Sequence, residues 1–199
     1  IRTLSSHNGD NSLDLRLSPG GMEEDGNRFQ FYGGKLDVLT SGSGDNQFSK
    51  AKGTLEIDRM TSTGDGSNFE MGVLKGELDY SRGSLLKATL RPNGVRMDNS
   101  AEGILFQVRD PALYVDFKFE PDSALMLGSS EFRIPKIEGK AMGSAISVEK
   151  SAFSYVAEKE EDKIRWRNRY ALGKISLKSS DPASPVQMAA PILANGLSF

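Results

Sequence analysis

Four cations occupy alternate positions in the segment 163–169, and their spacing is suited to binding anions. They are Lys163, Arg165, Arg167 and Arg169. Alternate residues of a strand project from the same face of a sheet. Arginines spaced about 6.6–6.8 Å apart along a strand can each bind a phosphate or a lipid headgroup through two parallel hydrogen bonds. The alternative is that these cations pair with acidic side chains of adjacent strands or of the preceding acidic run 158–162.

The same segment projects a second set of side chains from its other face. Trp166, which is the only tryptophan of the chain, and Tyr170 alternate with the arginines. Aromatic rings of this kind line a ligand groove or fill a core. We therefore take Arg165, Arg167, Arg169, Trp166 and Tyr170 as candidate ligand-binding residues.

Carboxylates recur at equivalent positions of a repeat, and paired carboxylates are the usual acid–base couple of a glycosidase. They are Asp37, Glu56, Asp58, Glu77 and Asp79. A glycosidase needs two carboxyl groups across a cleft, one of them shielded from water. Because these residues alternate with leucine, valine, isoleucine and tyrosine, we expect them on the wet face of a sheet, balanced by neighbouring lysines and arginines. We predict no catalytic residue among them.

The chain has few of the residue types that usually bind metal ions or act as catalytic nucleophiles. The chain has no cysteine, and its single histidine, His7, lies in a polar segment. The segments 8–11, 23–27, 42–46 and 63–68 contain Asp, Asn and Gly, but none has the spacing of a calcium-binding loop. We expect these segments to be turns, and we predict no metal and no cofactor.

A threefold repeat positions the charged residues. Phe29, Phe48 and Phe69 are each followed by a glycine and an alternating triplet. The triplets lie in Gly34–Val38, Gly53–Ile57 and Gly76–Tyr80. Units of about 20 residues have room for two strands each, and the polar segments 41–46 and 63–68 are typical of hairpin loops. The pattern predicts an all-β antiparallel meander whose curved or folded-over sheet has at most one or two short helices.

Later segments continue the pattern and indicate how the chain is divided. The rhythm breaks at residues 121–130, where one helical turn capped at Asp122 would fit, so we expect a seam between halves 1–120 and 131–199 of one continuous domain. Pro92-Asn93-Gly94 predicts a hairpin. Pro135 indicates an edge strand or a bulge, and Gly173 indicates a bulge. A C-terminal helix would fit 184–196.

Composition limits the classes of function. The chain of 199 residues has a net charge of −2 and no clustered basic excess, which argues against a nucleic-acid-binding or anionic-membrane surface. No run approaches the roughly 20 apolar residues of a membrane-spanning helix. Because the first residue is Ile1, we expect that an upstream segment, such as a signal peptide or anchor, has been removed.

Units of the form glycine, any residue, Leu/Ile, any residue, Ile/Val/Tyr resemble the repetitive β-sheet proteins of the Gram-negative envelope, the AsmA-like and YdgA-like groups. The resemblance is carried by Gly34–Val38, Gly53–Ile57, Gly76–Tyr80 and Gly173–Leu177 and covers about three-quarters of the chain. It implies a periplasmic or envelope location behind an N-terminal anchor, a curved β-sheet and, in some relatives, lipid cargo. It brings no catalytic residues. A secreted location is the alternative.

Three functions remain open from the sequence. The first is a non-catalytic envelope protein that holds or passes a lipid or acyl chain on the inner sheet face, with the arginines near a headgroup. The second is a scaffold whose exposed sheet edges bind a protein partner or a second copy. The third is a carboxylate-based hydrolase. We favour the first, because little predicted helix is available to cover the apolar face of the sheet.

Overall fold

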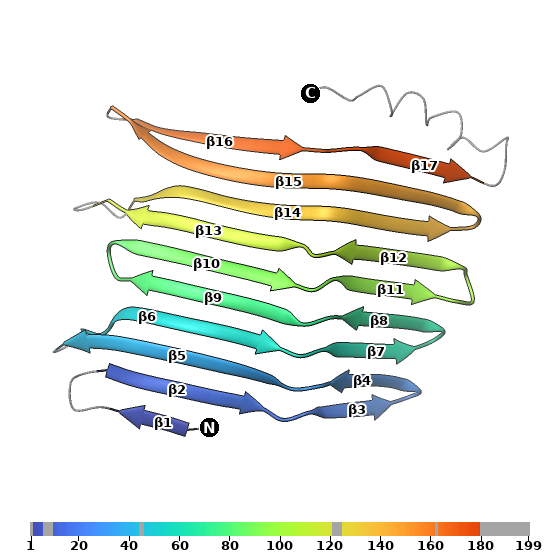
Figure 1. Cartoon of the computed structure of the whole chain (residues 1–199), viewed down its shortest axis with the longest axis horizontal. Coiled ribbons are helices and arrows are strands. Elements are labelled where there is room, and N and C mark those ends of the chain that lie inside the picture. Colours follow the sequence, from blue (N-terminus) through green and yellow to red (C-terminus); the bar gives the residue numbers. More distant parts are fainter. Residues whose placement is uncertain (1, 6–9, 44–45, 121–124, 162, 180–199) are drawn as a thin grey trace.

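A computed structural model describes residues 2–5, 10–43, 46–120, 125–161 and 163–179, and these residues form one antiparallel sheet (Figure 1). There is no helix among them, and therefore none of the length and apolarity needed to cross a membrane. The strands are β1 (Arg2–Ser5), β2 (Asp10–Leu17), β3 (Gly20–Glu24), β4 (Asn27–Phe31), β5 (Gly34–Ser43), β6 (Asn46–Ile57), β7 (Met60–Gly64), β8 (Ser67–Met71), β9 (Leu74–Ser81), β10 (Leu85–Pro92), β11 (Val95–Asn99), β12 (Ile104–Arg109), β13 (Ala112–Phe119), β14 (Met126–Ala141), β15 (Ser144–Glu160), β16 (Lys163–Ala171) and β17 (Ile175–Ser179).

Most strands are joined end to end as collinear pairs. The sheet therefore consists mainly of full-length strands that each run from its left side to its right side. β2 runs on into β3, β4 into β5, and so on to β16 and β17, while β14 and β15 each cross the sheet alone (Figure 1). These nine full-length strands pair with their neighbours in chain order, as a meander requires. The repeat unit of about 20 residues is therefore one full-length strand.

A line of interrupted pairing crosses the middle of the sheet, and we call it the hinge line. It divides a left half from a right half in Figure 1. Isolated pairs of backbone hydrogen bonds bridge it. One pair includes the bond from Tyr32 N to Arg59 O at 3.0 Å, and another includes the bond from Gly72 N to Gly94 O at 3.1 Å. Asp110 and Lys150 adopt positive φ angles of 45° and 59° on this line, a conformation that is costly for side chains with a Cβ.

Prolines are tolerated on the hinge line because the ladder is already interrupted there. Pro19 and Pro111 lie between collinear strands, Pro92 ends β10, and Pro135 lies within β14 opposite Lys150, at the one position where the β14–β15 pairing has a gap. A proline has no backbone N–H and would remove a hydrogen bond from a continuous ladder.

The hinge line also changes which residues face which side. In β2, every second residue, including Leu13 and Leu15, faces the same side. A continuation of this alternation through β3 would place Met22 on the other side. The apolar residues of β2, β3 and β4 nevertheless lie on the same face, because the ring of Phe31 on the right lies over Gly34 on the left. A Cβ on Gly34 would be 3.5 Å from Phe31 Cζ.

Two-residue turns close the first two right-hand hairpins. Asp25-Gly26 joins β3 to β4 with φ angles of 50° and 78°, and Asp65-Gly66 joins β7 to β8 with 48° and 74°. Positive φ at both central residues is the type I′ geometry, whose twist matches that of paired strands.

The described residues form a single layer, and a hydrophobic core is nearly absent. Ala112 and Ala157 are the hydrophobic residues that are fully buried, with 8% and 1% of their surface exposed. A sheet with one apolar face normally buries that face against a second layer. Here, no described element supplies one.

The all-β antiparallel meander predicted from the sequence is confirmed, and so are the hairpins at 41–46 and 63–68. The predicted hairpin at Pro92-Asn93-Gly94 is wrong, because β10 continues into β11 across the hinge line. Pro135 does not lie on an edge, since β14 pairs on both sides. Met126–Ser130, at the predicted seam, are strand; the helical turn at Asp122, the helix 184–196 and His7 lie outside the described residues.

Candidate functional site

One face of the sheet carries most of the apolar residues of the described strands, and we call it the apolar face. Residues directly opposite one another on successive strands share a face and form rows across the sheet. One row of the left half is Leu15, Leu36, Leu55, Gly76, Leu90, Leu113, Phe132, Phe153 and Tyr170. Its neighbour is Leu13, Val38, Gly53, Leu78, Ala88, Val115, Ser130, Tyr155 and Asn168.

The right half continues this face with more phenylalanine and methionine. The row beside the hinge line is Phe31, Met60, Met71, Val95, Val108, Ile137, Val148 and Ile175. The next row is Met22, Phe29, Ser62, Phe69, Met97, Phe106, Gly139, Ile146 and Leu177. Methionine is flexible and polarisable, and it is common on surfaces that adapt to apolar ligands of varied shape. None of these four rows contains a charged residue.

Many side chains of the apolar face remain open to water. Leu78 and Leu90, in the centre of the left half, are 39% and 38% exposed, and Met97 on the right is 51% exposed. Strand residues span about 3.3 Å each, so the stretch Asp10–Glu24 is roughly 50 Å long, and nine strands about 4.8 Å apart are roughly 40 Å wide. The whole face of the sheet therefore measures on the order of 2,000 Å², and the four apolar rows, about 6.7 Å apart along the strands, cover roughly half of it. The largest apolar patch of a typical monomer is about 300–600 Å².

An aromatic cluster lies at one end of the apolar face. Tyr155 contacts Phe117 and Trp166, with ring centroids 6.3 Å and 5.5 Å apart. Phe117 and Trp166 belong to one row, and Gly128 and Ala157 are the two residues between them in that row. Ala157 is 1% exposed. The small residues make room for the rings to lean over them. Phe153 and Tyr170 form a further pair at 4.9 Å.

A hollow of about 250 Å³ indents the apolar face near the right-hand turns. Phe69, Met97, Ile104 and Phe106 form its apolar side. The polar residues Asn27, Ser62, Ser67, Asn68, Asp98 and Asn99 line the rest, together with Gly64.

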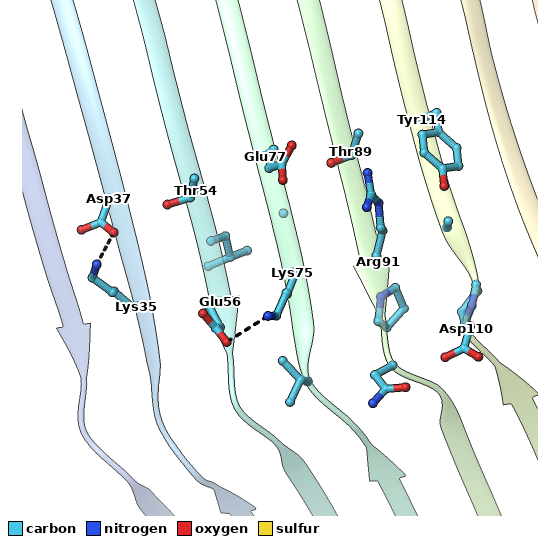
Figure 2. A pocket seen from close by; sticks show the side chains of 17 residues that line it. Lys35, Asp37, Thr54, Glu56, Lys75, Glu77, Thr89, Arg91, Asp110 and Tyr114 are labelled. Atoms are coloured by element: carbon cyan, nitrogen blue, oxygen red, sulfur yellow. Dashed lines mark ion pairs between the residues drawn. The ribbon is translucent and has the colours of Figure 1, made fainter.

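The opposite face, which we call the charged face, is a lattice of ion pairs in the left half. A hollow of about 700 Å³ lies on this face, with the ion pairs Lys35–Asp37 at 2.6 Å and Lys75–Glu56 at 3.6 Å along it. Figure 2 shows the side chains that line it. The hydrogen bond to Asp37 raises the pKa of Lys35 above its ordinary value. Glu77 lies in the same hollow between Thr54 and Thr89, the residues opposite it on the two neighbouring strands.

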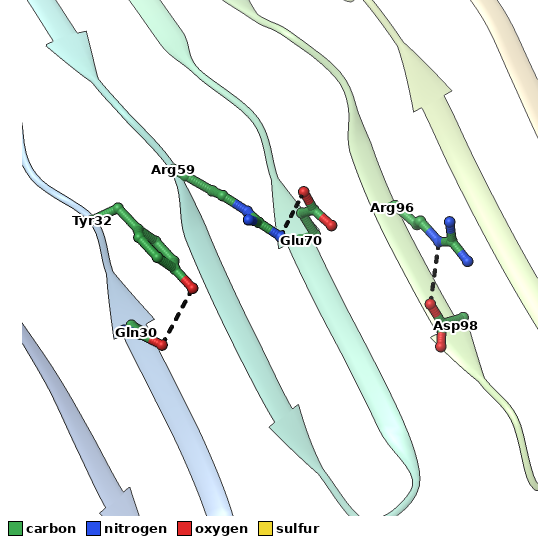
Figure 3. Close-up of polar contacts among 6 residues, drawn as sticks. All are labelled: Gln30, Tyr32, Arg59, Glu70, Arg96 and Asp98. Atoms are coloured by element: carbon green, nitrogen blue, oxygen red, sulfur yellow. Dashed lines mark hydrogen bonds and ion pairs between the residues drawn. The ribbon is translucent and has the colours of Figure 1, made fainter.

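The charged face continues across the hinge line with the same kind of contacts (Figure 3). The Arg59 guanidinium lies 3.0 Å from Glu70 and 5.3 Å from the centre of the Tyr32 ring. The Tyr32 hydroxyl donates a hydrogen bond to Gln30 Oε1 at 3.3 Å, and Arg96 donates to Asp98 at 3.2 Å. Exposed ion pairs such as these each contribute about 0–1 kcal/mol, so the charged face acts mainly as a solvated surface.

The candidate arginines lie on the charged face, at the edge of the sheet. Arg165 pairs with Glu160 at 2.8 Å, and Arg167 pairs with Glu158. Arg169 lies opposite Ser154 and has no ion pair with another described residue. Two of the three arginines therefore contact acidic residues of the neighbouring strand.

The candidate aromatics project from the opposite side of the same strand, β16. Trp166 is 59% exposed and Tyr170 is 76% exposed. Among the described strands, β16 pairs with β15 alone and so forms a sheet edge. The arginines and the aromatics are thus separated by the thickness of one strand, and a ligand on the apolar face would reach the arginines around this edge.

Sequence reasoning missed the right half of the apolar face. Alternation was present at Phe29-x-Phe31, Phe69-x-Met71 and Val95-x-Met97, but each run is short and ends at the hinge line. The carboxylates Asp37, Glu56 and Asp79 lie on the charged face in ion pairs. The described residues contain no group of three His, Asp or Glu side chains placed to hold a metal ion.

Comparison with known proteins finds no family model, curated protein or solved structure that matches the chain. The apolar face itself is therefore the observation from which a function can be argued.

Proposed function

We propose that this chain is a non-catalytic protein of the cell envelope that holds or passes a lipid or acyl chain on its apolar face. The observation that carries this proposal is a sheet face on the order of 2,000 Å², with four charge-free and largely apolar rows across it, that no described element covers. At about 25 cal/mol per Å² of apolar surface removed from water, even a few hundred Å² of contact with an acyl chain supplies several kcal/mol.

The make-up of the face suits an aliphatic ligand. The four rows consist mainly of leucine, valine, isoleucine, phenylalanine and methionine, so they would select mainly for length and apolarity. Their polar members are Ser62, Ser130, Tyr155, Asn168 and Tyr170. At the β16 edge, Arg169 is a cation without an ion pair to another described residue, and it would contact an anionic headgroup there. The envelope location rests on the resemblance to AsmA-like and YdgA-like proteins.

Trp166 provides a direct test, because it is the only tryptophan and lies on the apolar face. A fatty acid that carries bromine on its chain quenches indole fluorescence on contact. We expect saturable quenching of Trp166 by the brominated fatty acid, and no saturable quenching by a brominated, water-soluble short-chain acid.

A pair of adjacent variants locates the site. Leu78→Asp places a charge in the centre of the apolar face, whereas Glu77→Ser changes the next residue, which faces the opposite side. Leu78 is 39% exposed, so its replacement leaves no closed cavity. We expect Leu78→Asp to weaken binding tenfold or more and Glu77→Ser to leave it unchanged, with circular dichroism confirming that both variants fold. Equal binding by both variants would contradict the proposal.

A further inference from the structure

The site of the proposed function is incomplete in one chain. Ligand sites usually bury 70–90% or more of a small molecule's surface. An acyl chain lying on a single layer would have its other side in water, and no described element lies above the four rows.

We propose that a second copy of this chain covers the ligand, so that two apolar faces enclose a layer of acyl chains. This inference rests on the proposed function. The partner at that site is an identical chain, and two chains enclose one layer of ligand.

The area of the face fits a second copy. Two faces on the order of 2,000 Å² each would together remove about 4,000 Å² from water. Obligate homodimers bury about 2,000–5,000 Å² in total, so the face has the size of a permanent interface rather than of a transient contact.

Charge favours pairing through this face. The four rows lack charged residues, so the central parts of two identical faces can meet without like-charge repulsion, as a twofold axis requires. The edge strand β16 instead carries Lys163, Arg165, Arg167 and Arg169, and an antiparallel pairing of two β16 edges would bring these cations together.

The charged face is unsuited to the same role. Many of its cations and carboxylates already pair with one another within the chain, as in Lys52–Asp79 at 3.4 Å and Lys87–Asp116 at 3.1 Å. Burying these pairs would cost their solvation without adding new partners. In the proposed dimer the charged faces point outward to water.

Size-exclusion chromatography with light scattering on the oleate-loaded protein, followed by extraction of the bound fatty acid, tests the inference. We expect twice the mass of one chain, with oleate recovered from that peak. Met97→Asp places a charge in the centre of the right half and should give a single chain, while Arg96→Gln, on the charged face, should remain a dimer. Met97 is 51% exposed, and circular dichroism verifies the fold of both variants.

The contrary outcomes separate the two proposals. A single chain that retains oleate would overturn the second copy and leave the proposed function standing. A dimer without oleate, when oleate was supplied, would overturn the enclosed ligand layer and the proposed function together. A loaded dimer that persists in Met97→Asp would show that the copies meet through another surface, and would overturn the inference.

Discussion

Gly128 allows the aromatic cluster of the apolar face to form. Its φ angle is 145°, and a Cβ added there would lie 2.1 Å from the carbonyl oxygen of Asp116. Only a shift of the β13 backbone could relieve such a contact, and Phe117, which leads into the cluster, would move with it.

We predict that Gly128→Ala lowers the free energy of unfolding by about 1–3 kcal/mol, the usual cost of overpacking combined with an unfavourable φ angle. Gly20→Ala is the control, because nothing lies within 4 Å of its added Cβ. Urea titration followed by Trp166 fluorescence measures both variants. An unfolding midpoint of Gly128→Ala equal to that of Gly20→Ala would show that the β13–β14 contact is looser than described.

Glu138 is the carboxylate of the charged face with the most cations around it. Lys136 lies 2.8 Å from one carboxylate oxygen and Arg109 lies 2.7 Å from the other. The hydrogen bond from Lys136, with the charge of Arg109, holds the pKa of Glu138 below its ordinary value. A carboxylate with a lowered pKa in the folded state stabilises the fold at neutral pH, and this contribution is lost as the pH falls through the folded-state pKa.

We therefore predict that Glu138→Gln reduces the loss of stability between pH 7 and about pH 3–4, by at most about 1 kcal/mol for pairs as exposed as these. Glu77→Gln, which changes a carboxylate of the same face that has no ion pair with a described residue, is the control variant. Melting temperatures across this pH range provide the comparison. A larger fall in melting temperature on acidification in Glu138→Gln than in the parent chain would contradict the prediction.

At the scale of elements, the hinge line sets the shape of each full-length strand. Lys150 has a φ angle of 59° opposite Pro135, in a region that costs a non-glycine residue about 1–2 kcal/mol. Lys140 lies in the same long hairpin but in regular pairing with Leu105 and Ala145.

The two lysines should respond to glycine in opposite directions. We predict that Lys150→Gly raises the free energy of unfolding by up to about 1 kcal/mol, because glycine adopts positive φ without steric cost. Lys140→Gly should lower it by about 0.5–1 kcal/mol, because glycine weakens a regular strand. Thermal unfolding of both variants decides. Destabilisation by Lys150→Gly would mean that the lysine side chain contributes more than its backbone strain costs.

The edge strand β16 has a different task. Its alternate cations discourage other strands from pairing with the open edge, as lysine and arginine commonly do on sheet edges. We predict that replacing Lys163, Arg165 and Arg167 by threonine produces concentration-dependent growth beyond a dimer, measured by dynamic light scattering. The same replacement at the interior positions Lys52, Lys75 and Lys87 should not, because those strands are paired on both sides.

Sequence patterns predicted the strands better than their connections. Leu113, Val115 and Phe117 alternate without fault and form β13. Pro92-Asn93-Gly94 has the composition of a hairpin turn, yet the chain does not reverse there. Gly94, with its φ angle of 81°, instead forms part of the short break between the collinear strands β10 and β11 at the hinge line. Proline and glycine indicate a break in a ladder, and local composition does not distinguish a reversal of the chain from a kink.

At the scale of the whole molecule, the continuity of the apolar face could not be predicted from alternation. A period-two pattern places Phe31 and Leu36 on opposite faces, because they are five residues apart. The hinge line shifts the parity and returns both to one face, which depends on the irregular backbone at Tyr32-Gly33. The candidate residues of β16 were identified from the sequence, while the Met–Phe half of the surface became visible only in the fold.

The sheet therefore separates two chemistries: a charged face whose ion pairs are satisfied within the chain, and an apolar face that lacks a cover among the described residues. Native mass spectrometry of the protein purified from cells, paired with organic extraction, tests this account most directly. The account predicts an additional bound mass that extracts as fatty acid or phospholipid and that is lost in Leu78→Asp. A bare chain that yields no extractable lipid, and does not take up oleate when it is supplied, would contradict it.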